Sequence, residues 1–377
     1  MIELHKKGAV MNNGGIVFLC GSRDFHAMDW YRSALKVFPG RKILLLTDLI
    51  ESEGYKKLIN NEDSIHKLIV IDLILCKKQS YYCDKWRNII KLIVLPFQVF
   101  LLHRFSKKNV NYIFHAHSMY YMLLASLAGL KYYGFPQGSD ILIKPWKSHL
   151  YKIFSKYAII KAQKVIVDSS KMADGILKIA NTEAIVVQNG INIPLILNLQ
   201  KNNDNLKINR DNITSFRGLT SLYNIDKIFI ARNSSYNYNH VPINLIYPFS
   251  ELSYNKYLNT LVQDFDINYG RLDKEELFNI FYKTLLAISI PSSDSSPRSV
   301  YEAIFCGAAV ALTYHPFIDE LPTCMKQRII LVDTNENNWF DSAVKSAVNI
   351  TSRQFTPSKK ALIEFDQFSA IKKIDNI

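Results

Sequence analysis

Short apolar runs alternate with longer helix-like stretches along most of the chain, and this alternation constrains the fold more than any other feature. Each run has the length of a strand and is apolar almost throughout, which is typical of strands buried on both faces of a parallel sheet. The repetition of strand and helix therefore predicts an α/β, doubly wound fold. The runs are residues 16–20, 42–47, 68–73, 112–116, 165–168 and 184–188.

The chain has 377 residues, enough for two α/β domains with separate cores. After Pro194 the sequence becomes polar, and residues 200–211 are rich in Asn, Lys and Asp, as expected of a linker. We predict an N-terminal domain over residues 1–195, a linker over 196–211 and a second domain over 212–355. Within and after the second domain we expect strands at 227–231 and 243–247, a helix at 275–283 and a helical tail at 358–373.

Composition indicates a soluble globular protein with an unusual charge. Apolar residues make up 48% and charged residues 21%, but the formal net charge is +13. A surplus of this size favours an anionic partner such as a membrane surface, a phosphorylated small molecule or nucleic acid. We expect no nucleic-acid partner, because no helix-turn-helix, RNP-like or zinc pattern is present. The five cysteines are odd in number and lie mostly in apolar surroundings, which predicts reduced thiols and a cytoplasmic protein. They include no C-x-x-C pair, so neither a zinc ribbon nor a thioredoxin-like site is expected.

Residues 85–108 depart from the general pattern, because they form an apolar stretch with basic residues at both ends. The uninterrupted apolar part, of about 11 residues around Pro96, is too short to span a bilayer. A buried core helix is one interpretation. The other is a helix lying at a membrane interface with Trp86 and the basic residues at headgroup level. The surplus positive charge favours the second interpretation slightly and predicts contact with an anionic membrane surface.

A strand, loop and helix near the C-terminus carry the clearest signs of a binding site. Residues 285–290 form an apolar strand, 291–296 a loop of Ser, Asp and Pro, and 297–306 a helix. Ser296 can cap this helix, Pro297 suits its first position, and Gly307 can adopt the left-handed conformation that ends it. Another buried strand is expected to follow.

Such a loop presents backbone N–H groups at the carboxyl edge of a sheet, where a helix N-terminus attracts phosphate. Here they belong to Arg298, Ser299 and Val300, and the side chain of Arg298 can add a charged contact. Glu302, about one turn further on, can accept hydrogen bonds from two ribose hydroxyls, and Asp294 can do the same for a transferred sugar. The structural alternative is a capped helix with two solvated acids.

Five short motifs resemble those of one enzyme family. They are FHAHS at 114–118, the Gly-Ser-Asp turn within 135–140, the strand ending in Ser at 165–169, the Asn-Gly-Ile turn within 187–191, and the acidic pair with seven residues between its members. Their order and spacing are similar to those of the family-4 glycosyltransferases, which are retaining enzymes of the GT-B fold. The resemblance implies two Rossmann-like doubly wound parallel-sheet domains facing across a cleft that holds the donor. It also implies that a C-terminal helix, residues 356–377, returns to the first domain.

Carried over position by position, the resemblance places Glu302 on the ribose and Asp294 where the family usually has its first glutamate. Arg217 matches the arginine that holds the diphosphate. No lysine falls cleanly at the family's second cationic position, and the nearest, Lys227, fits a following helix or strand better. His117 is implied to lie near the transferred sugar or the acceptor.

Two polar motifs have to be considered as metal sites, and five other polar residues of the first domain are candidates for the acceptor side. His115 and His117 should point to the same face of their strand, but no third ligand lies at metal-binding spacing, so we expect no metal. Asp264 and Asp266 form an Asp-x-Asp that resembles a surface loop, and we expect no metal there either. The acceptor-side candidates are Arg23, Asp24, His26, Asp29 and Asp140.

The predicted function is retaining transfer of a sugar from a nucleotide-diphosphate donor to an acceptor hydroxyl. We expect neither cofactor nor metal. The basic apolar segment at 85–108 favours a lipid-linked acceptor or a growing bacterial surface glycan such as lipopolysaccharide, and a peripheral position at the inner face of the membrane. Two alternatives remain open, namely a sugar-nucleotide epimerase of the same architecture and a non-catalytic relative that binds nucleotide weakly or not at all.

Overall fold

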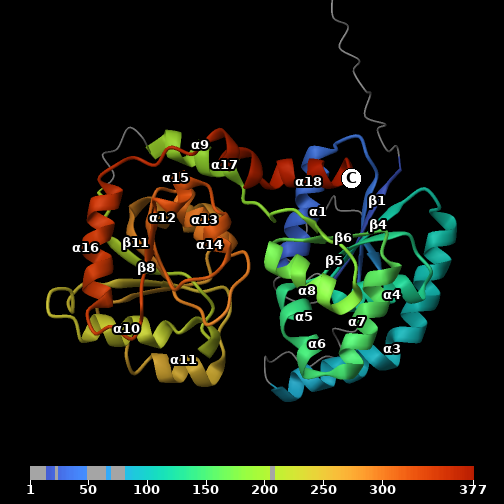
Figure 1. Ribbon diagram of the computed structural model, residues 1–377, viewed down its shortest axis with the longest axis horizontal. Coiled ribbons are helices and arrows are strands. Elements are labelled where there is room, and N and C mark those ends of the chain that lie inside the picture. Colours follow the sequence, from blue (N-terminus) through green and yellow to red (C-terminus); the bar gives the residue numbers. More distant parts are fainter. Residues whose placement is uncertain (1–13, 22–23, 49–64, 69–80, 204–208) are drawn as a thin grey trace, which may run out of the picture. The chain divides into compact units, whose positions relative to one another are not determined.

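The structure of the protein is a computed structural model that describes residues 14–21, 24–48, 65–68, 81–203 and 209–377. It divides into two compact units (Figure 1). The first consists of Met1–Gln188 together with Gln367–Ile377, and the second of Asn189–Asp366. The division falls a few residues before the expected end of the first domain. Only the last helix of the chain, not the whole tail from residue 356, belongs to the first unit.

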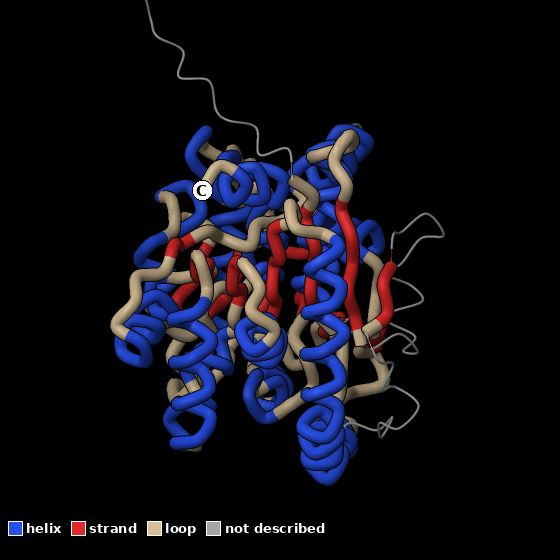
Figure 2. The backbone as a smooth tube through the Cα atoms, turned by 90° about the vertical axis from the view of Figure 1, so that its right-hand side faces the viewer, coloured by secondary structure: helices blue, strands red, loops and turns tan. Residues whose placement is uncertain are grey.

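The first unit contains a seven-stranded parallel sheet in the order β3-β2-β1-β4-β5-β6-β7. Figure 2 shows the strands lying between helices, as in a doubly wound fold. Five of the six predicted runs contain strands. The run at 68–73 lies mostly outside the described residues, and the strand found near it is β3. The strands are β1 (Ile16–Leu19), β2 (Ile43–Thr47), β3 (Ile65–Lys67), β4 (Ile113–His117), β5 (Tyr132–Phe135), β6 (Lys164–Val167) and β7 (Ile185–Val186).

Helices bury both faces of this sheet. One core packs α1 and the C-terminal helix α18 against Phe18 and its neighbours, and the other packs α3, α4, α7 and α8 against Phe114 and its neighbours. An ion pair between Arg41 and Asp375 fastens α18. The helices are α1 (Phe25–Val37), α3 (Tyr81–Lys108), α4 (Met119–Leu127), α5 (Gly138–Leu142), α6 (Lys144–Lys147), α7 (His149–Lys161), α8 (Ser170–Ala180) and α18 (Gln367–Asp375).

The second unit contains a six-stranded parallel sheet in the order β10-β9-β8-β11-β12-β13. Its strands are β8 (Asn212–Ser215), β9 (Ile243–Ile246), β10 (Ile267–Gly270), β11 (Thr284–Ser289), β12 (Ala309–Leu312) and β13 (Ile329–Leu331). Its α-helices are α9 (Ile193–Asn203), α10 (Ile225–Asn233), α11 (Leu252–Leu258), α12 (Lys274–Lys283), α13 (Arg298–Phe305), α14 (Phe317–Glu320), α15 (Thr323–Lys326), α16 (Trp339–Thr351) and α17 (Lys359–Glu364).

Two predictions for the second unit are wrong. The strand expected at 227–231 is part of helix α10, because its apolar residues recur at helical spacing and bury Ile225, Ile228 and Phe229 in one core. The linker expected at 196–211 begins inside helix α9. That helix buries Ile196 against the second unit, and the Tyr282 hydroxyl donates a hydrogen bond to the Ile196 carbonyl.

The apolar segment at 85–108 is a single long helix, α3, with Pro96 inside it. Within Asn88–Lys108, the mean hydropathy reaches 1.6 and only 17% of the most apolar window is buried, so the buried-core interpretation is wrong. By length and composition alone this helix is long enough to cross a membrane. We had expected it to be too short, because its uninterrupted apolar part has only about 11 residues. Such a single helix is weak evidence of a span, and α3 packs against α4 of its own unit.

Candidate functional site

The predicted strand, loop and helix are present as β11, residues 290–297 and α13. The helix begins at Arg298, with Pro297 rather than Ser296 as its N-cap residue. The predicted Ser296 cap is therefore wrong, and the Ser296 hydroxyl instead lies 3.4 Å from that of Tyr301. Gly307 has φ +87°, so the helix ends in the left-handed conformation expected of this glycine. The loop and the first turn of α13 thus lie at the carboxyl edge of the second sheet.

Arg217 follows β8 and lies against this loop. One guanidinium nitrogen is 2.7 Å from Asp294 Oδ2, and another donates to Ser299 Oγ at 3.1 Å. The guanidinium also lies over the ring of Tyr223, with its carbon 4.6 Å from the ring centroid. The side chains of Arg217 and Asp294 are only 10% and 14% exposed, so both charges are partly desolvated. The structure therefore brings three of the predicted site residues together and holds the cation in one orientation.

Glu302 lies on α13 and is 1% exposed. Its Oε1 atom accepts a hydrogen bond from Lys274 Nζ at 2.6 Å, whereas Oε2 has no hydrogen-bond partner in the described part of the chain. A buried carboxylate oxygen without a donor is costly, and a bound ligand or an ordered water can supply the missing donor. Lys274 was not predicted from the sequence, because nothing distinguishes it among the 46 lysines and arginines of the chain before α12 and α13 pack together.

The other predicted phosphate contacts have partners within the protein. Arg298 Nε donates to the Gly190 carbonyl at 2.7 Å and so fastens the Asn-Gly-Ile turn to α13. The N–H of Val300 donates to the Pro297 carbonyl at 3.0 Å. A phosphate role for either residue stays a prediction and requires these bonds to be shared or broken.

Cys306 ends α13, but its surroundings exclude it as a nucleophile. Burial raises the pKa of the Cys306 thiol well above its ordinary value, and the nearby charge of Glu302 raises it further. The thiol therefore stays protonated at neutral pH, and only a thiolate is an effective nucleophile.

His117 ends β4 of the first unit, and its ring stacks on that of Phe135 with centroids 4.4 Å apart. His115 packs against the same Phe135, so the two histidines share one face of the strand, as predicted. Burial lowers the pKa of His115 to about 3 and that of His117 well below 6.5, so both rings are neutral at physiological pH. Among described residues, His117 Nε2 and His115 Nδ1 have no hydrogen-bond partner. A neutral ring at a strand end can bind a hydroxyl, and contact with sugar or acceptor stays a prediction.

The acceptor-side candidates differ in what surrounds them. Asp24 caps α1 and accepts a hydrogen bond from Gln137 Nε2 at 2.6 Å. Asp29 and the exposed His26 lie on the same helix, whereas Arg23 lies outside the described residues.

Asp140 is 2% exposed and accepts four hydrogen bonds, so the structure uses it to hold helices together. Its donors are the backbone N–H groups of Met119 and Gln137, Lys144 Nζ and the Tyr151 hydroxyl. This set leaves little capacity for an acceptor, and we do not propose that role for Asp140.

The Asp-x-Asp motif lies in an exposed turn, as expected, but one of its two carboxylates points inward. The Asp266 side chain is 1% exposed and forms an ion pair with the fully buried Arg232, with a closest N–O distance of 2.5 Å. The backbone N–H of Ile243 also donates to Asp266 at 2.8 Å. Asp266 is therefore a structural carboxylate, whereas Asp264 is exposed. Within the described ranges, no group of three or more His, Cys, Asp or Glu side chains is arranged to hold a metal ion.

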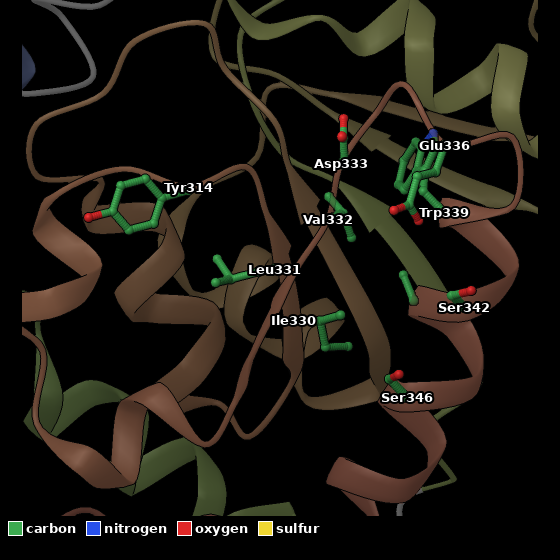
Figure 3. A pocket seen from close by; sticks show the side chains of 10 residues that line it. Tyr314, Ile330, Leu331, Val332, Asp333, Glu336, Trp339, Ser342 and Ser346 are labelled. Atoms are coloured by element: carbon green, nitrogen blue, oxygen red, sulfur yellow. The ribbon is translucent and has the colours of Figure 1, made fainter.

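A separate open cavity of about 420 Å³ lies beside β13 and the start of α16 (Figure 3). Its lining combines apolar side chains such as Ile330 and Trp339 with Asp333 and Glu336. Neither the Arg217 pair nor Glu302 contributes to this lining, so the cavity is distinct from the candidate site.

Comparisons with known proteins support the fold. No protein-family model matches the sequence, and no curated protein matches it significantly. Solved structures do match. HepE from Anabaena, in complex with UDP and glucose, superposes with a TM-score of 0.67 and 14% identity over 96% of this chain and 98% of that chain. Sucrose-phosphate synthase from Thermosynechococcus elongatus gives a TM-score of 0.70 and 12% identity over 96% and 97%. A glycosyltransferase from Rickettsia africae gives 0.62 and 12% over 96% of each chain.

The chain therefore has the two-unit α/β architecture of the GT-B fold, as the resemblance implied. Identities of 12% to 14% show the fold alone. What the site does has to be argued from its own residues.

Proposed function

We propose that this protein is a retaining glycosyltransferase, similar to those of family 4, that moves a sugar from a nucleotide-diphosphate donor to an acceptor hydroxyl. The observation that carries the proposal is the unpartnered Oε2 atom of Glu302, on the helix whose first turn Arg217 contacts through Ser299. The carboxylate acceptor on this helix and the fixed cation against its first turn match the hydroxyl and phosphate groups of a nucleotide. HepE has been crystallised with UDP, so UDP is the first nucleotide to test.

The donor would be held by opposite charges. Arg217 would bind the diphosphate, together with the N-terminal turn of α13, whose dipole favours anions. Glu302 would accept hydrogen bonds from the ribose, with Lys274 holding the carboxylate in place. Asp294 already accepts from Arg217, so it would compete with the diphosphate for this cation and turn toward the transferred sugar when the donor binds.

The chemistry requires stabilisation of charge rather than a protein nucleophile. As the bond between the sugar and the diphosphate breaks, negative charge develops on the leaving oxygen and positive charge on the sugar ring. Arg217 would stabilise the first, and it is already oriented by Asp294, Ser299 and Tyr223. The acceptor oxygen would form the new bond on the same face of the sugar and pass its proton to the departing diphosphate oxygen. We expect this to proceed without a metal or other cofactor, because a fixed arginine can supply the charge.

We propose a lipid-linked acceptor or a growing bacterial surface glycan, and a peripheral position at the inner face of the membrane. Support comes from α3, which is exposed along most of its apolar length. A membrane-bound acceptor would place surface polysaccharide synthesis, including that of lipopolysaccharide, among the pathways to test. Nucleic acid is not a proposed partner.

A screen of nucleotide sugars by thermal shift, followed by transfer to lipid-linked acceptors, tests the proposal. We expect one donor to stabilise the protein and to be consumed only when an acceptor is present, and the product anomer, determined by NMR, to match the donor. Conversion of the donor alone would identify an epimerase instead. A protein that no nucleotide or nucleotide sugar stabilises would be a non-catalytic relative.

A further inference from the structure

Positive charge is concentrated in one part of the first unit. Of the 46 Lys and Arg residues in the chain, thirteen lie within residues 85–167, whereas that segment contains a single acid, Asp140. It therefore carries twelve of the thirteen net positive charges of the protein. Asp140 is buried and paired with Lys144, so exposed charge on this segment is positive throughout.

Helix α3 buries Ile90, Gln98 and Leu102 and leaves a row of large apolar side chains exposed. Gln98 is fully buried and donates to Asp48 Oδ2 at 3.2 Å, while its Oε1 accepts from the Tyr120 hydroxyl at 2.5 Å. These bonds fix the rotation of the helix, because both partners belong to the rest of the unit. The outward side chains recur at helical spacing and are 38% to 64% exposed, and they are Trp86, Ile89, Leu92, Ile93, Phe97, Phe100 and Leu101.

Helices α6 and α7 present a second outward apolar stripe of the same kind. On α7 the buried residues are Ser155, Ala158 and Ile159, whereas several other large apolar side chains are exposed. The exposed residues follow one another at intervals of three or four, as one face of a helix requires. On α7 they are Leu150, Ile153, Tyr157 and Ile160, with exposures of 39% to 61%, and Trp146 on α6 is 52% exposed.

The helices α3 and α7, which carry most of the two stripes, share one hydrophobic core and so cover the same face of the first sheet. Helix α4 packs against both α3 and α7, and the three lie near one another in Figure 1. Leu127 of α4 is itself 43% exposed. Exposed lysines and arginines occur beside the stripes at Arg104, Lys107 and Lys108 on α3, at Lys147 on α6, and at Lys156 and Lys161 on α7.

We propose that the outward faces of α3, α6 and α7 together form a docking face for an anionic lipid bilayer. Apolar side chains would enter the interface while the lysines and arginines meet negatively charged headgroups. A second copy of the chain is a poor occupant, because two faces of this charge would repel each other. Nucleic acid would leave the apolar stripes in water. The inference extends the membrane contact proposed above to a second element, and it does not depend on sugar transfer.

Co-sedimentation of the full chain with vesicles tests this docking face. The vesicles would contain phosphatidylcholine alone or with 30% phosphatidylglycerol, a composition chosen to supply negative charge. We expect binding to the anionic vesicles only. The paired substitution Leu150→Gln with Ile153→Gln on α7, and the pair Phe97→Gln with Phe100→Gln on α3, should each weaken partitioning at least tenfold.

Control variants separate the contributions of apolar and charged side chains to vesicle binding. Leu252→Gln with Ile363→Gln removes two apolar residues of the second unit that are 70% and 66% exposed, and it should leave partitioning unchanged. Lys156→Gln with Lys161→Gln should weaken partitioning about 30-fold, since each lysine near an anionic surface is worth about fivefold. Nucleotide binding should be unaffected in all these variants, which distinguishes failure of the docking face from failure of the proposed enzyme.

Three results would overturn the proposal. Equal binding to neutral and anionic vesicles would show that the lysines and arginines do not contribute to docking. Loss of binding in the α3 variant but not in the α7 variant would exclude the two-helix face. Dimerisation in sedimentation, abolished by the α7 substitutions without any vesicle binding, would assign the face to a second copy.

Discussion

Replacement of Asp294 by Asn should tighten the binding of UDP. Asp294 Oδ2 lies 2.7 Å from an Arg217 nitrogen, and both side chains are mostly buried. A diphosphate bound to the same arginine would lie roughly 5 Å from the carboxylate. At an effective dielectric constant between about 20 and 80, two like charges at that distance repel by about 1 to 3 kcal/mol. Asn keeps the shape and one acceptor oxygen while removing this repulsion.

Titration calorimetry at fixed low salt measures the effect. We expect the Kd for UDP to fall about 5- to 100-fold in Asp294→Asn, because about 1.4 kcal/mol corresponds to a factor of ten. In Arg217→Ala, UDP binding should weaken about 10- to 100-fold through loss of a charged hydrogen bond. Adding Asp294→Asn to that variant should then have much less effect, since the shared cation is gone.

The same variant separates two roles of the carboxylate. If Asp294 also contacts the transferred sugar, the gain in affinity for the nucleotide sugar should be smaller than the gain for UDP. Unchanged or weaker UDP binding in Asp294→Asn, with Arg217 intact, would refute the idea that the two anions compete for one arginine.

Three further predictions concern stability and the lysine that sequence analysis missed. The pKa of His115 is about 3 in the folded protein and about 6.5 in the unfolded chain, so between these pH values the unfolded chain binds more protons. The free energy of unfolding should therefore decline from pH 6.5 toward pH 3, and this residue contributes up to about 1.4 kcal/mol per pH unit to the decline. Urea unfolding at pH 6 and pH 4 should show a shallower decline in His115→Phe. Asp266→Ala should lower the unfolding free energy by about 3 to 5 kcal/mol, whereas Asp264→Ala changes it by less than about 0.5, and equal effects would contradict the buried pair. Lys274→Ala should lower the free energy of unfolding by about 1 kcal/mol, and this effect should disappear when Glu302 is also replaced by Gln. An effect of the same size in the Glu302→Gln protein would mean that the two side chains are not coupled.

Hydrophobic patterning was enough to predict most of the sheet strands, because a strand buried on both faces leaves a continuous apolar run. It failed at residues 227–231, where an apolar run of strand length is one side of helix α10. It also failed at 196–203, where the polar end of helix α9 resembles a linker in sequence. In both cases tertiary packing, which a local window does not contain, decides the structure.

The residues of the candidate site also divide into those that could be predicted from the sequence and those that could not. The acids, Arg217 and the helix that carries Glu302 were accessible because local motifs and the family resemblance mark them. The partners of those residues were not, since Lys274 and Tyr223 reach the site only through packing between elements distant in the sequence. The buried role of Asp266 was missed for the same reason.

The most direct test of the proposed donor site is the affinity of UDP and UDP-sugars for Glu302→Ala. Glu275→Ala serves as the matched control, because it removes an exposed carboxylate from the nearby helix α12. Titration calorimetry should show a loss of about 10- to 100-fold in Glu302→Ala, from hydrogen bonds to a charged group worth about 1.5 to 3 kcal/mol, and no change in the control. Unfolding curves without nucleotide would establish that both variants are folded. Wild-type affinity in a folded Glu302→Ala variant would contradict the placement of the nucleotide on this carboxylate.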